Sequence, residues 1–164
     1  MALGFAQEGM PPVPTEELKR VDFMTGEWSG TDIMYFAGQK STSTSKSKSD
    51  TILGGRYIRT MVEYTMEGMP AMTGMHMLTY DAEKKAYVGW WFDSMAPGVM
   101  RMEGNFEGDK LIMVSDPTPI PGMPGNQTMR ATWNKNGDKG VMFKLELKQG
   151  DKWEPMIEGD YKKP

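Results

Sequence analysis

The sequence predicts an all-β fold: an antiparallel up-and-down barrel of about ten strands with a short helix at its N-terminal end. Short apolar segments recur along the chain and are separated by turns rich in Gly, Asn and Asp, which is typical of consecutive hairpins. The clearest hairpin joins residues 72–80 to residues 86–94 through the polar turn 81–85, and both of its faces carry large side chains. Such a hairpin needs neighbouring strands, and a barrel whose last strand pairs with the first leaves no free edge.

Each element is predicted from local pattern. Thr15 is placed to cap a helix over residues 16–24, because two acidic residues follow it in the first turn. The run of serines and threonines in residues 41–49 leads directly into residues 51–53 and predicts an exposed polar strand. Four prolines in residues 116–126 predict an irregular loop. The expected strands are residues 27–37, 41–53, 56–66, 72–80, 86–94, 99–106, 110–115, 127–134, 140–148 and 153–161.

Length and charge limit the possible partners. The chain has 164 residues, which predicts one barrel domain over residues 15–164 after an extended or disordered segment, residues 1–14. A net charge of -3 does not favour nucleic acid or an anionic membrane, and no apolar run is long enough for a transmembrane helix. There is no cysteine, which excludes disulfides and thiolate metal sites. The oligomeric state cannot be predicted from these properties.

The first residues suggest a compartment. Residues 1–6 are similar to the trimmed end of a secretion signal, because Gly4 and Ala6 are small residues spaced as at a cleavage site. On this interpretation the protein is periplasmic or extracellular. The alternative is an ordinary frayed terminus on a cytoplasmic protein.

Several motifs resemble those of known barrels. The segment GEWSG at residues 26–30 resembles the start of calycin-type barrels, which include lipocalins, fatty-acid-binding proteins and nitrobindins. The chain also resembles, over most of residues 15–161, a bacterial family of uncharacterised calycin-like domains. This resemblance implies the barrel fold and no particular activity. Nitrobindins bind haem through a histidine late in the chain, whereas the single histidine here is His76, so no cofactor is expected. The matching segments are residues 53–57, 68–70, 79–81, 87–88 and 91–95.

The leading hypothesis for function is binding of a small apolar or amphipathic molecule inside the barrel. Alternation along four strands defines an apolar set that we expect to face the interior, where it either lines a cavity or fills the space. A polar set lies on the opposite face, and it becomes a buried polar site if the faces are inverted. The apolar set is Ile58, Val62, Met75, Met77, Val88, Trp90, Phe92, Met100 and Met102; the polar set is Arg59, Glu63, His76, Asp93, Arg101 and Glu103.

Two other functions remain open. The 18 methionines either replace leucine in the core or include a site for Cu(I), which prefers thioether and imidazole ligands. Met69, Met72 and His76 could meet on one ion only if residues 69–72 fold back as a loop. An enzyme of unknown reaction is less expected, because the sequence lacks a nucleophile elbow, a phosphate loop and a multi-histidine site. No catalytic residue is therefore assigned.

Overall fold

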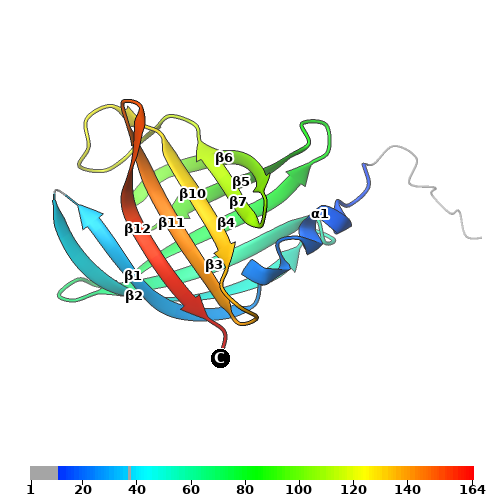
Figure 1. The fold of residues 1–164 in the computed structure, drawn as a ribbon, viewed down its shortest axis with the longest axis horizontal. Helices are drawn as coiled ribbons and strands as arrows, with labels where there is room; N and C mark the ends of the chain where they lie inside the picture. The colour runs from blue at the N-terminus through cyan, green and yellow to red at the C-terminus, as the bar shows by residue number, and fades with distance from the viewer. Residues whose placement is uncertain (1–10, 37) are drawn as a thin grey trace, which may run out of the picture.

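Ten strands form a closed antiparallel barrel in the computed structural model, which describes residues 11–36 and 38–164 (Figure 1). The order around the barrel is β1-β12-β11-β10-β7-β6-β5-β4-β3-β2. Pairing of β1 with β12 closes it, so the expected return of the last strand to the first is confirmed. The strands are β1 (Glu27–Phe36), β2 (Gln39–Ile52), β3 (Tyr57–Met66), β4 (Met72–Asp81), β5 (Ala86–Asp93), β6 (Ala96–Glu107), β7 (Lys110–Ser115), β10 (Met129–Lys135), β11 (Gly140–Gln149) and β12 (Lys152–Lys162).

The N-terminal helix is shorter than expected. Helix α1 covers Thr15–Lys19, and a 3-10 turn, η1, covers Asp22–Met24. Pro14 occupies the N-cap position, and the hydroxyl of Thr15 donates to the carbonyl of Val13, so the expected cap by Thr15 is wrong. Residues 11–14 have no regular structure, and the signal-like residues 1–6 lie outside the described part. No helix in the described ranges is long and apolar enough to span a membrane.

Two segments differ from their sequence-based description. The proline-rich segment 116–126 is not entirely irregular, because β8 (Thr118–Pro119) pairs with β9 (Asn126–Gln127). Strand β2 forms as expected, but only one of its faces is exposed. Ser43 and Ser45 are buried, whereas the alternating residues Thr44 and Lys46 are exposed. Ser43, Ser45, Ser47 and Ser49 therefore face the barrel interior, whereas Thr42, Thr44, Lys46 and Lys48 face solvent.

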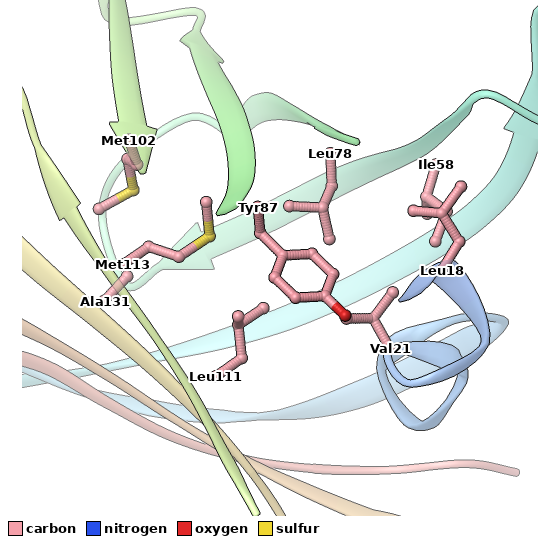
Figure 2. Packing of buried hydrophobic residues seen from close by; sticks show 9 residues of the cluster. All are labelled: Leu18, Val21, Ile58, Leu78, Tyr87, Met102, Leu111, Met113 and Ala131. Atoms are coloured by element: carbon pink, nitrogen blue, oxygen red, sulfur yellow. The ribbon is translucent and has the colours of Figure 1, made fainter. Parts of the chain in front are cut away.

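The helical segment fills one part of the barrel (Figure 2). Leu18 and Val21 pack into a cluster of buried apolar side chains, and the hydroxyl of Tyr87 donates to the carbonyl of Glu17 at 2.7 Å. Burial of these side chains stabilises the contact by roughly 1.5–3 kcal/mol for each large residue. The cluster, shown in Figure 2, is Leu18, Val21, Ile58, Leu78, Tyr87, Met102, Leu111, Met113 and Ala131.

His76 and Trp133 form a contact across the interior. The imidazole of His76 on β4 stacks on the indole of Trp133 on β10, with ring centroids 5.5 Å apart and planes 12° apart. Between β4 and β10 the barrel has three strands on one side, β5 to β7, and five on the other, β11, β12, β1, β2 and β3. The stack therefore divides the interior into a three-strand side and a five-strand side.

The imidazole of His76 is kept neutral. The side chain is buried, and burial lowers its pKa to about 4. Its Nε2 has no hydrogen-bond partner among the described residues and lies against Gly89, where an added Cβ would be 2.7 Å from it. Glycine at this position in β5 thus leaves the space that the imidazole occupies.

We expect His76 to make the protein less stable at acidic pH. Between pH 6.5 and 4 the unfolded chain protonates this histidine while the folded chain does not, so the free energy of unfolding falls by about 3 kcal/mol through this group as the pH is lowered. Above pH 6.5 the group contributes no pH dependence. Urea unfolding at several pH values should show a flatter profile for His76→Gln than for the wild type. Equal slopes would contradict the burial of a neutral imidazole.

Candidate functional site

The five-strand side of the interior is lined by two chemically different walls. Hydroxyl side chains of β2 and β3 form one wall, and aromatic and aliphatic side chains of β11 and β12 form the other. Nine of these interior-facing side chains are half-buried, so solvent reaches them, whereas others on the same strands, such as Ser43 and Val141, are buried. On the three-strand side, Tyr87, Leu111 and Met113 are at most 1% exposed. The half-buried residues are Ser47, Ser49, Thr60, Val62 and Tyr64 on the first wall and Phe143, Leu145, Ile157 and Tyr161 on the second.

A buried carboxylate connects the two walls at β1. Asp32 is 4% exposed and accepts hydrogen bonds from the hydroxyls of Ser43, Ser45 and Tyr161. The ring of Tyr161 reaches it across Gly159, where an added Cβ would lie 2.5 Å from the tyrosine hydroxyl. Burial and the charge of Asp32 raise the pKa of Tyr161, so its hydroxyl stays protonated and donates.

A second carboxylate, Asp93, lies on β5, just across β4 from the first wall, and Tyr64 of β3 connects it to that wall. The hydroxyl of Tyr64 donates to both oxygens of Asp93, at 3.0 and 2.8 Å, and the indole Nε1 of Trp91 donates to Oδ2 at 3.0 Å. Burial and this hydrogen bond to Asp93 raise the pKa of Tyr64. The Trp91 ring lies over Gly74, where an added Cβ would be 2.1 Å from it.

The two carboxylate groups belong to one polar belt. Ser45, which donates to Asp32, is directly opposite Tyr64, which donates to Asp93. In the described part of the chain, neither carboxylate has a lysine or arginine within ion-pair distance. We define the polar belt as Tyr161, Asp32, Ser43, Ser45, Tyr64, Asp93 and Trp91. Of the polar belt, only Asp93 was a candidate from sequence. The alternating serines of residues 41–49 were the signal that could have indicated Ser43 and Ser45.

The predicted apolar set does not share one face. Ile58 is opposite Leu78, and Arg59 is opposite Met77, so the β3 residues of the set and its β4 residues point to opposite sides of the sheet. The prediction of a single interior set is therefore wrong. Residues that pair directly across neighbouring strands share a face, and the face that carries the buried cluster is the interior one. On this basis the interior residues are Ile58, Val62, Met100 and Met102, and the outward residues are Met75, Met77, Val88, Trp90 and Phe92.

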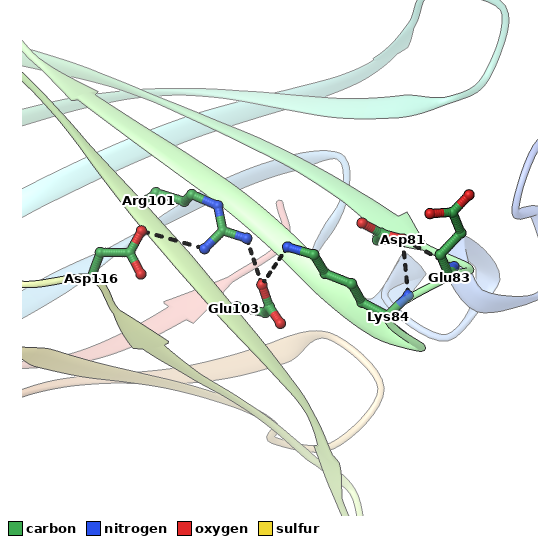
Figure 3. Close-up of polar contacts among 6 residues, drawn as sticks. All are labelled: Asp81, Glu83, Lys84, Arg101, Glu103 and Asp116. Atoms are coloured by element: carbon green, nitrogen blue, oxygen red, sulfur yellow. Dashed lines mark hydrogen bonds and ion pairs between the residues drawn. The ribbon is translucent and has the colours of Figure 1, made fainter.

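The predicted polar set divides in the same way. His76 and Asp93 face the interior, whereas the other four residues face outward. Figure 3 shows part of this outer surface, where Arg101 lies 3.4 Å from Asp116 and also pairs with Glu103, which Lys84 reaches at 3.3 Å. Exposed ion pairs of this kind contribute little to stability. The outward-facing members are Arg59, Glu63, Arg101 and Glu103.

The structure does not bring the three predicted copper ligands together. Met69 lies in the turn before β4, with 44% of its surface exposed. Met72 and His76 share the interior face of β4, but four residues of strand separate them by about 13 Å. The Trp91 ring lies over Gly74, between them. Among residues 11–36 and 38–164, no group of three or more His, Cys, Asp or Glu could hold a metal ion.

Two hollows border residues of the first wall. A cavity of about 10 Å³, large enough for one water molecule, lies beside His76 and Thr60 under the 3-10 turn. An open hollow of about 520 Å³ lies at β1 to β4, and we call it the outer hollow because most of its lining residues, such as Lys46, Met61 and Glu63, face outward. Its charged lining includes the exposed pair Lys48–Glu27, at 2.9 Å. The hollow is lined by Glu27, Trp28, Ser29, Lys46, Ser47, Lys48, Met61, Val62, Glu63, Thr73 and Pro164.

Comparisons with known proteins agree with this architecture. The structure of Rv2717c from M. tuberculosis is similar with a TM-score of 0.69 and 10% sequence identity, over 90% of this chain and 97% of that one. The S-type phycobiliprotein lyase CPES from Guillardia theta is similar with a TM-score of 0.58 and 12% identity, over 92% and 96% of the two chains. At these identities the likeness shows the fold alone. A search of curated proteins found no significant match. Residues 13–163 match the family DUF1579, described as a protein of unknown function, and the chain therefore belongs to that family.

Proposed function

We propose that the protein binds a small amphipathic molecule on the five-strand side of the barrel interior. The observation that carries this proposal is the half-buried state of two opposed inner walls, one of hydroxyls and one of aromatic and aliphatic groups. A site that combines apolar surface with a few placed polar groups is typical of small-molecule binding. The likeness in fold to a phycobiliprotein lyase supports the handling of a small molecule in general terms.

The polar belt favours one kind of polar group on the ligand. Asp32 on β1 and Asp93, which lies on β5 and accepts from Tyr64 of β3, place negative charge beside the first wall without a basic side chain as a partner in the described chain. The hydroxyl of Tyr64 already donates its proton to Asp93, so its oxygen can accept from a ligand. A neutral or positively charged donor group suits this environment better than a carboxylate. Phe143, Leu145 and Ile157 would contact the apolar part.

Filling the five-strand side should weaken binding. Ser47 and Lys46 are neighbours in β2 with opposite directions, so Ser47→Phe adds a ring to the interior and Lys46→Phe adds it to the outside. In a fluorescence titration with N-phenyl-1-naphthylamine, we expect Ser47→Phe to weaken binding at least about tenfold, or about 1.4 kcal/mol, and Lys46→Phe to bind like the wild type. Weakened binding in Lys46→Phe alone would place the ligand in the outer hollow and contradict the proposal.

A positively charged head group on the ligand should bind more tightly than a negatively charged one. Dodecylamine, dodecanol and dodecanoate share a chain and differ in the head group. In competition with N-phenyl-1-naphthylamine at pH 7, below the micellar concentration of each compound, we expect the ammonium to compete at least about tenfold better than the carboxylate, because like charges repel strongly in a partly dehydrated site. Dodecanol should lie between them. Better competition by dodecanoate would contradict the role given to the polar belt.

A further inference from the structure

The outward-facing apolar residues form a continuous surface on β3 to β6. Direct pairing aligns one residue from each of these strands in a row, and a second row lies next to it. The outer members of the first row, Met61 and Val99, are 45% and 46% exposed, and Phe92 is 36% exposed. The first row is Met61, Met75, Phe92 and Val99, and the second is Arg59, Met77, Trp90 and Arg101. We define the outer apolar patch as Met61, Met75, Met77, Trp90, Phe92 and Val99.

Charged residues at both edges of the outer apolar patch are already paired. Arg59 forms a bidentate pair with Asp50, at 2.9 and 2.6 Å, on the β2 edge. Arg101 pairs with Glu103 and Asp116 on the β7 edge. Each edge therefore carries both positive and negative charges, with no excess of positive charge. A polyanion or an anionic membrane needs such an excess, so neither suits this surface. An uncharged apolar centre with mixed charges at each edge suits the same surface of another copy.

We propose that the outer apolar patch is the contact face of a homodimer. A two-fold dimer uses the same surface on both copies, so it requires a surface that is self-complementary in charge and in polarity. The two rows of the outer apolar patch lie about 7 Å apart, at the centre of an outer face of about 20 by 30 Å that four strands about 4.8 Å apart, each with about ten residues, provide. Contact over this whole face would bury about 600 Å² per copy, which is near the lower limit for a specific interface, so association should be weak, in the micromolar range. This proposal is independent of ligand binding inside the barrel.

Sedimentation velocity from 5 to 200 µM tests the dimer. The wild type should shift from monomer towards dimer as its concentration rises. Phe92→Asp and Val99→Asp, which each place a charge in the outer apolar patch, should weaken association at least about tenfold. The matched control is Met142→Asp, because Met142 is 49% exposed on the outside of β11, away from the patch. Circular dichroism of each variant should match that of the wild type.

Three results would overturn the proposal. A wild type that remains monomeric at 200 µM excludes a dimer of this strength. Equal dissociation by Met142→Asp and Phe92→Asp would place the interface elsewhere. A monomer that binds phosphatidylcholine vesicles, and loses this binding in Phe92→Asp, would make a lipid surface the occupant of the patch.

Discussion

The stack of His76 on Trp133 determines how the barrel interior is used. It joins β4 to β10 across the interior, and both rings come from strands that face each other rather than from a turn. Burial keeps the imidazole neutral, and Gly89 leaves the space that its Nε2 occupies. With these strands fixed, Tyr87, Leu111 and Met113 fill the three-strand side, and the helical segment packs beside the stack, in contact with both β3 and β4.

The five-strand side has different chemistry because its polar groups satisfy one another. Asp32 is held by three hydroxyls, and Asp93, on the neighbouring strand β5, is held by Tyr64, Trp91 and a backbone N–H, so both carboxylates remain within the barrel without a basic partner in the described chain. Hydrogen bonds to a charged acceptor are the stronger kind, which favours a rigid wall. A rigid polar wall opposite an apolar one can orient an amphipathic molecule, which connects the fold to the proposed binding.

The sequence predicted the barrel correctly because hairpin turns and strand periodicity are local signals. The orientation of β4 and β5 could not be predicted, since both of their faces carry large apolar side chains and a register difference of one residue inverts the faces. Phe92, on the outside, is as apolar as any core residue, whereas Ser45, on the inside, looks like a surface residue. The candidate site was therefore largely missed: its polar groups, such as Asp32 and Tyr161, come from opposite ends of the chain and meet only through pairing of β1 with β12.

The division of the interior can be measured directly by xenon binding in crystals of the purified protein. Xenon occupies accessible apolar space and is visible by its anomalous scattering. Xenon or a co-purified ligand should appear on the five-strand side, between Ser47 and Leu145, and none should appear among Tyr87, Leu111 and Met113. Side chains that fill the five-strand side completely, with xenon only in the outer hollow or among the residues of the three-strand side, would contradict the central claim that the His76–Trp133 stack separates a filled side from an accessible one.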